Sequence, residues 1–102
     1  MTDLPTLALA WVRDPAYVEM TARQIALLGL ITQSGPQGFW RVRELAPAIG
    51  ASKPVITRAL NAFEVMGLAE RVRDPDDRRS INIVPTEAAF VLREALREIG
   101  NG

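Results

Sequence analysis

The stretch GLAERVRDPDDRRSINIV, residues 67–84, decides the fold. Apolar and polar residues alternate on both sides of a charged centre, which is the pattern of two short β-strands. Residues 74–77 of this centre begin with Asp74 followed by Pro75, as a type I turn prefers. The stretch therefore predicts a β-hairpin. The alternation puts Leu68, Glu70 and Val72 on one face of the first strand and Arg71 and Arg73 on the other, and it alternates Ile81 and Ile83 with Asn82 and Val84 on the second strand.

The segment before the hairpin predicts an amphipathic helix over residues 53–66. Ser52 stands at its N-cap position, Pro54 falls in its first turn, and Gly67 ends it. At 100° per residue, one arc of this helix is apolar, and the opposite arc near the helix start is polar and basic. The apolar arc holds Val55, Ile56, Ala59, Leu60, Ala62, Phe63 and Met66, and the opposite arc holds Lys53, Pro54, Thr57, Arg58 and Asn61.

Four further helices are predicted, over residues 6–12, 22–33, 42–49 and about 87–98. Asp14-Pro15 closes the first, a capping box of Thr21 and Gln24 opens the second, Gly50 ends the third, and Thr86 caps the last. The second helix is apolar nearly all round and is expected to form the buried centre. A turn over residues 34–38 and a short strand over residues 39–41 precede the third helix. This order predicts a winged helix-turn-helix, a mainly α fold with a small β-hairpin, as a single domain over residues 1–102.

Residues 42–88 resemble the MarR family of bacterial transcriptional regulators. The resemblance rests on Glu-Leu-Ala at residues 44–46, ASKPVITRAL at residues 51–60 and GLAERVRDPDDRRS at residues 67–80. Thr86 takes the place of the family's usual leucine-threonine pair, although Pro85 stands where leucine is common. In that family, the second helix of the pair lies in the major groove of DNA. An arginine at the tip of the hairpin, held by a nearby aspartate, enters the flanking minor groove.

The resemblance implies a set of DNA contacts in this chain. Lysine and arginine can contact guanine or phosphate, asparagine can pair with adenine, and threonine or proline can touch a thymine methyl. We expect Arg79, or failing that Arg78, to enter the minor groove, because a guanidinium suits the negative potential of a narrow minor groove. The predicted contacts are Ser52, Lys53, Pro54, Thr57, Arg58 and Asn61 in the major groove, Arg71, Arg73, Asp77, Arg78 and Arg79 in the hairpin, and Arg41 and Arg43 on the DNA backbone.

The resemblance also bears on assembly. Members of the family are usually longer, with terminal helices that interlock into a dimer and frame a ligand cleft. Here the terminal segments are short but carry apolar residues, which favours a homodimer on palindromic double-stranded DNA and does not favour a small-molecule pocket. These residues are Leu7, Leu9, Trp11, Leu92, Leu96 and Ile99.

The composition excludes several classes of site. The chain has no cysteine and no histidine, which excludes disulfides, the usual zinc sites and histidine-based catalysis. We therefore predict no metal, no cofactor and no catalytic residue. The longest apolar run, residues 25–31, is far too short for a membrane span, and no signal peptide is visible. The absence of cysteine fits a cytoplasmic protein, and the resemblance implies a bacterial one. The net charge is zero, but residues 40–80 hold eight basic and six acidic side chains.

Two other interpretations stay open at this point. The polar arc of the helix and the charged hairpin can each be a solvated surface, with the arginines and aspartates of the hairpin neutralising one another. A winged helix can also serve as a protein-interaction module that no longer binds DNA. The dependence of binding affinity on ionic strength distinguishes these interpretations, because DNA binding weakens steeply as ionic strength rises, whereas binding through an apolar interface does not.

Overall fold

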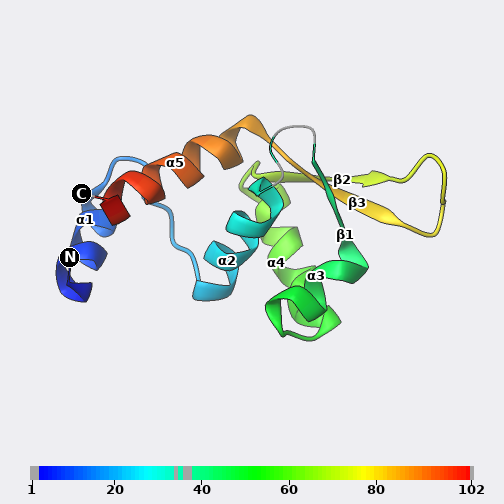
Figure 1. Cartoon of the computed structure of the whole chain (residues 1–102), viewed down its shortest axis with the longest axis horizontal. Coiled ribbons are helices and arrows are strands. Elements are labelled where there is room, and N and C mark those ends of the chain that lie inside the picture. The colour runs from blue at the N-terminus through cyan, green and yellow to red at the C-terminus, as the bar shows by residue number, and fades with distance from the viewer. Residues whose placement is uncertain (1–2, 34, 36–37, 102) are drawn as a thin grey trace.

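The computed structural model describes residues 3–33, 35 and 38–101. Their elements follow the predicted order and confirm the winged helix-turn-helix, with α3 and α4 as the helix pair (Figure 1). We call residues 69–85, which comprise β2, β3 and the tip between them, the wing. The predicted turn over residues 34–38 includes residues 34, 36 and 37, which lie outside the described residues. The elements are α1 (Leu4–Arg13), α2 (Ala22–Thr32), β1 (Trp40–Arg41), α3 (Val42–Ile49), α4 (Lys53–Val65), β2 (Ala69–Arg73), β3 (Ile81–Pro85) and α5 (Glu87–Asn101).

The helix boundaries follow from local capping. At the start of α2, the Thr21 hydroxyl accepts from the Gln24 amide at 3.1 Å, and the Gln24 side chain accepts from the Thr21 amide at 2.8 Å, as the capping box predicts. Helix α1 begins before the predicted residue 6, because the Asp3 carboxylate accepts from the Thr6 amide at 2.9 Å. Ser52 is the N-cap residue of α4, as predicted, but its side chain makes no capping bond.

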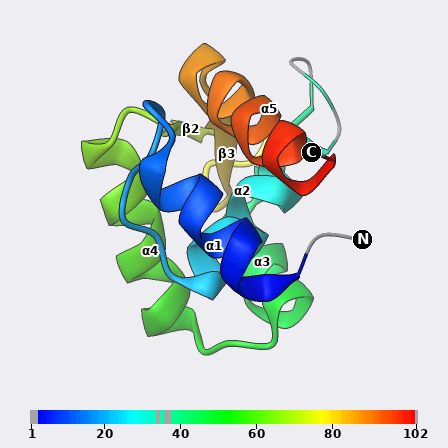
Figure 2. The ribbon, with the colours of Figure 1, turned by 90° about the vertical axis from the view of Figure 1, so that its left-hand side faces the viewer.

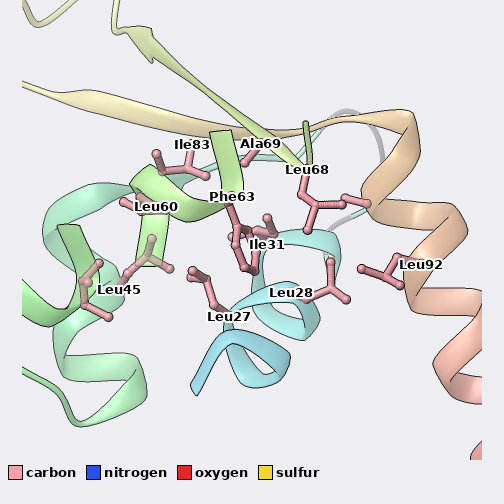
Figure 3. Packing of buried hydrophobic residues seen from close by; sticks show 12 residues of the cluster. Leu27, Leu28, Ile31, Leu45, Leu60, Phe63, Leu68, Ala69, Ile83 and Leu92 are labelled. Carbon is pink, nitrogen blue, oxygen red and sulfur yellow. The ribbon is translucent and has the colours of Figure 1, made fainter. Parts of the chain in front are cut away.

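The core lies between the sheet and the helices α2, α3 and α4, and the first half of α5 adds Ala89 and Leu92 to it (Figure 3). Leu27, Leu28 and Ile31 of α2 are fully or almost fully buried, and Phe63 of α4 packs among them. Helix α2 supplies Leu27, Leu28 and Ile31 to the core, as expected of the buried centre, but it is not buried on every side, because Ile25 is 40% exposed.

The sheet has strand order β1-β3-β2, and both pairings are antiparallel. Its burial departs from the predicted alternation, because Val72 and Ile81 are exposed whereas the polar Asn82 is buried. Only the base of the wing, at Ala69 and Ile83, reaches the core, next to Leu68. The outer part of the hairpin extends beyond the helices (Figure 1), so its apolar residues Val72 and Ile81 stay partly exposed.

The C-terminal end of α2 is a junction between distant parts of the chain. The Trp40 indole of β1 donates to the Leu30 carbonyl at 2.7 Å, and the Arg93 guanidinium of α5 donates to the Thr32 carbonyl at 2.9 Å. Each carbonyl also accepts a main-chain bond, from the Gln33 and Gly35 amides respectively, so the two side chains provide a second donor to each carbonyl. These two hydrogen bonds hold β1 and α5 against the same end of α2.

The two terminal helices pack together at the end of the molecule opposite the wing (Figures 1 and 2). Helix α1 contributes no fully buried residue, and Leu4, Leu9 and Val12 on α1 and Val91 on α5 stay exposed. No helix in the described part of the chain is long and apolar enough to cross a membrane.

Candidate nucleic-acid interface

The predicted polar arc of α4 forms a fully exposed face at the start of the helix. We call it the reading face; the apolar arc on the other side of the helix is buried or half-buried, as predicted. The Thr57 hydroxyl donates to the Lys53 carbonyl at 3.0 Å, so it is already satisfied within the helix. The reading face consists of Ser52, Lys53, Pro54, Thr57, Arg58 and Asn61.

The tip of the wing, residues 74–80, is shaped by two aspartates. The Asp74 carboxylate accepts from the amides of Asp76 and Asp77 at 2.9 and 3.3 Å. The Asp77 carboxylate accepts from the Arg79 amide and from the Ser80 hydroxyl, both at 3.0 Å. A main-chain bond from the Asp74 amide to the Ser80 carbonyl closes the loop at 3.0 Å. The tip is therefore fixed by side chain to main chain bonds.

The hydrogen-bonded turn of the tip is displaced from the predicted one. The Ser80 amide donates to the Asp77 carbonyl at 3.0 Å, so the turn spans residues 77–80 and not residues 74–77. Asp74 instead uses its carboxylate to bond the amides that follow it, a local alternative to the turn that sequence alone cannot distinguish.

Asp77 acts on Arg79 through the main chain. Its carboxylate bonds the Arg79 amide and not the guanidinium, which stays exposed. These bonds from the Arg79 amide and the Ser80 hydroxyl lower the pKa of Asp77, and Arg43 and Arg41 lower it further through their charges. The carboxylate is therefore ionised at neutral pH and keeps the tip in one shape.

A groove of about 280 Å³ connects the two predicted reading elements. It lies between the starts of α3 and α4 and the wing, and Val42, Ile56 and Ile81 provide apolar walls. Four basic side chains line it: Arg41, Arg43, Lys53 and Arg79. The fold thus brings together residues from three predicted groups, the reading face, the wing and the backbone contacts.

Two of the predicted contact residues are used within the fold. Arg41 forms an ion pair with Asp74 at 3.7 Å, and Arg71 forms one with Glu64. Within the described part of the chain, the six other basic side chains of residues 40–80 take part in no ion pair. These six are Arg43, Lys53, Arg58, Arg73, Arg78 and Arg79.

One basic residue near the reading face was absent from the predicted set. Arg23, in the first turn of α2, lines a second groove together with Arg58 of α4. Helix starts favour acidic residues, so a basic residue in the first turn of α2 was the available signal. The sequence does not show that the start of α2 lies beside α4, so the position of Arg23 next to Arg58 could not be predicted from it.

Comparisons with known proteins give consistent results. A model of the MarR family matches residues 20–81. Among solved structures, MepR of S. aureus in complex with DNA superimposes with a TM-score of 0.75 at 27% identity, over 80% of this chain and 65% of that one. The transcriptional regulator Tm0710 of Thermotoga maritima superimposes with a TM-score of 0.70 at 29% identity, over 79% and 56% of the two chains.

A third structure shares the fold over more of the chain. YusO of Bacillus subtilis superimposes with a TM-score of 0.76 at 18% identity, over 95% of this chain and 64% of that one. The chain thus spans less than two thirds of the length of each of these structures. No curated protein matches the sequence at a significant level.

Proposed function

The chain belongs to the MarR family, and from this premise we propose that it is a transcriptional regulator that binds double-stranded DNA. Members of this family are transcriptional regulators and not enzymes. We place the reading face of α4 in the major groove and the tip of the wing in the flanking minor groove. Arg79 is our candidate for the side chain that enters the minor groove, and Arg78 is the second candidate.

The basic groove between α4 and the wing carries this proposal. Lys53 at the start of α4 and Arg79 at the tip line the same groove, together with Arg43 of α3. Unpaired basic side chains on facing elements suit a polyanion that passes between them. The net charge of zero does not oppose this, because eight of the twelve basic side chains lie in residues 40–80.

The solvated-surface interpretation accounts less well for the tip. If the arginines and aspartates merely neutralised each other, the aspartates would pair with Arg78 and Arg79. Instead, Asp74 and Asp77 bond main-chain amides, and the paired partner of Asp74 is Arg41. The aspartates thus shape the tip and leave its arginines available to a partner. The DNA complex of MepR, at 27% identity, supports DNA as that partner.

We further propose that two copies bind a palindromic site as a repressor. The support is the exposed apolar surface of α1, which lies at the end opposite the wing and leaves both reading elements free. It comprises Leu4, Leu9 and Val12. Two-fold pairing of helix-turn-helix proteins matches half-sites about one helical turn, roughly 34 Å, apart.

The proposal is tested by selection from random duplexes, followed by affinity measurements on the enriched sequence. We expect an enriched palindrome and an affinity that falls steeply as salt rises. A protein-interaction module would instead enrich no sequence, and any residual binding to DNA would be independent of sequence. That result would overturn the proposed function.

A further inference from the structure

Arg71 lies where the wing meets α4. Its guanidinium donates to the Glu64 carboxylate, with which it also forms an ion pair, and approaches the Thr57 carbonyl at 3.4 Å. Its register partner on β3, Ile83, is buried in the core. Register partners share one face of a sheet, so Arg71 points toward the helices and not away from the protein.

The two acceptors on α4 lie two helical turns apart on one side of the helix. Thr57 belongs to the reading face, and Glu64 is the only acidic residue of α4. One guanidinium therefore connects the wing to both the reading half and the C-terminal half of α4. Arginine suits this task because its planar fork offers several N–H donors, whereas lysine offers one compact charge.

The base of the wing packs in the core with Leu60 and Phe63 of α4, but few other polar contacts fix the wing relative to α4. Within the described residues, no other hydrogen bond or ion pair joins β2 or β3 to α4. Beyond Arg71, Val72 and Ile81 are 43% and 40% exposed, so the outer hairpin is not anchored by a core. An exposed ion pair adds little to global stability.

We infer that Arg71 is a positioning residue that clips the wing to the recognition helix and not a contact to DNA. The clip, Arg71 with Glu64 and the Thr57 carbonyl, fixes the relative angle of the two reading elements. It thereby couples recognition of the A·T-rich flank by the tip to recognition of the core by α4. The part of this inference that concerns DNA rests on the proposed function, and it changes the predicted role of Arg71.

The test is the affinity of the intact chain for two duplexes with the same core and either A·T or G·C flanks. Glu64→Gln removes a negative charge beside the DNA, which alone raises affinity for both duplexes. If the clip holds, Glu64→Gln instead lowers the A·T-to-G·C affinity ratio by about two- to fivefold, the range expected for the coupling of an exposed ion pair. Arg71→Lys lowers the ratio in the same direction, while preference within the core is kept.

The matched control is Glu70→Gln, which removes the same charge from the neighbouring, exposed position of β2. We expect it to leave the flank ratio unchanged. If Arg71 is a phosphate contact, Glu64→Gln frees it and strengthens binding to both duplexes by the same factor, so that the flank ratio is unchanged, and Arg71→Lys binds like the wild type. Either of these results would overturn the clip.

A second measurement needs no DNA. Amide hydrogen exchange of the tip, followed at Asp74 and Ser80, should speed up in Glu64→Gln and Arg71→Lys but not in Glu70→Gln, with an unchanged thermal midpoint. Unchanged exchange in the first two variants would refute the clip even if the protein binds DNA. If the wild type binds no duplex while exchange responds as expected, the proposed function fails and the mechanical role of Arg71 stands.

Discussion

Replacing Arg79 by alanine removes one unpaired charge from the tip of the wing. Of the eight basic side chains in residues 40–80, two are paired, which leaves at most six for phosphates in each protomer. Each phosphate contact contributes about −0.9 to the slope of log affinity against log salt, so the wild-type slope is about −5 per protomer. Between 50 and 200 mM salt, this corresponds to a loss of affinity on the order of 10³-fold per protomer. Arg79→Ala should reduce the steepness of the slope by about 0.9 per protomer.

The same variant should lose most affinity on sites with A·T-rich flanks, where the minor groove is narrow and its potential most negative. Arg97→Ala is the matched control, because it removes the same charge from an exposed position on α5, at the other end of the molecule. The assay is fluorescence anisotropy over a salt series with A·T-flanked and G·C-flanked duplexes. If Arg79→Ala matches the control in both slope and flank preference, the tip does not contact DNA and the wing assignment is refuted.

Four further variants test other parts of the interface and fold. Asn61→Ala should cost about 1–3 kcal/mol of binding free energy and relax preference at one base pair per half-site, measured on single-substitution duplexes; an equal loss on every duplex would make Asn61 a phosphate contact. Asp77→Ala should weaken flank preference less than Arg79→Ala does, because it loosens the tip without deleting the guanidinium. Since folding lowers the Asp77 pKa, its bonds should persist at neutral pH and be lost only as pH falls through a value below the usual 3.8, which an NMR titration of the Ser80 amide would detect. Phe63→Ala should lower the free energy of unfolding by about 3–5 kcal/mol in urea titrations, since that ring is fully buried. Leu9→Lys should leave the fold intact and convert a dimer to monomers in sedimentation, because Leu9 is 49% exposed on the proposed dimer surface; a monomeric wild type would exclude that surface as the interface.

The helix boundaries could be predicted because they depend on neighbouring residues. The Thr21 and Gln24 capping box and the glycines after α3 and α4 act within a few positions of the sequence. Gly50 and Gly67 have φ values of 77° and 72°, the left-handed conformation in which glycine is favoured at a helix end. The reading face was predictable for the same reason, since one helical period places its members together.

The remaining features depend on partners distant in the sequence. The pairing of Arg71 with Glu64 is set by the way β2 returns along α4, so sequence alone could not predict it. Burial of the wing follows from how far the hairpin extends beyond the helices, and alternation cannot predict this. For that reason the alternation did not indicate that Val72 and Ile81 are exposed.

In the tip of the wing, the residues that fix the loop conformation are different from the arginines that we propose to contact DNA. Its shape is held by Asp74, Asp77 and Ser80, and no described residue other than glycine has a positive φ, so residues 78 and 79 need no special backbone conformation. Most amino acids can therefore occupy these two positions without altering the loop. If the wing reads the flank as proposed, related regulators can therefore differ in flank preference through residues 78 and 79 while the rest of the fold stays the same. A library randomised at residues 78 and 79 alone is a direct route to engineered variants with new flank preferences.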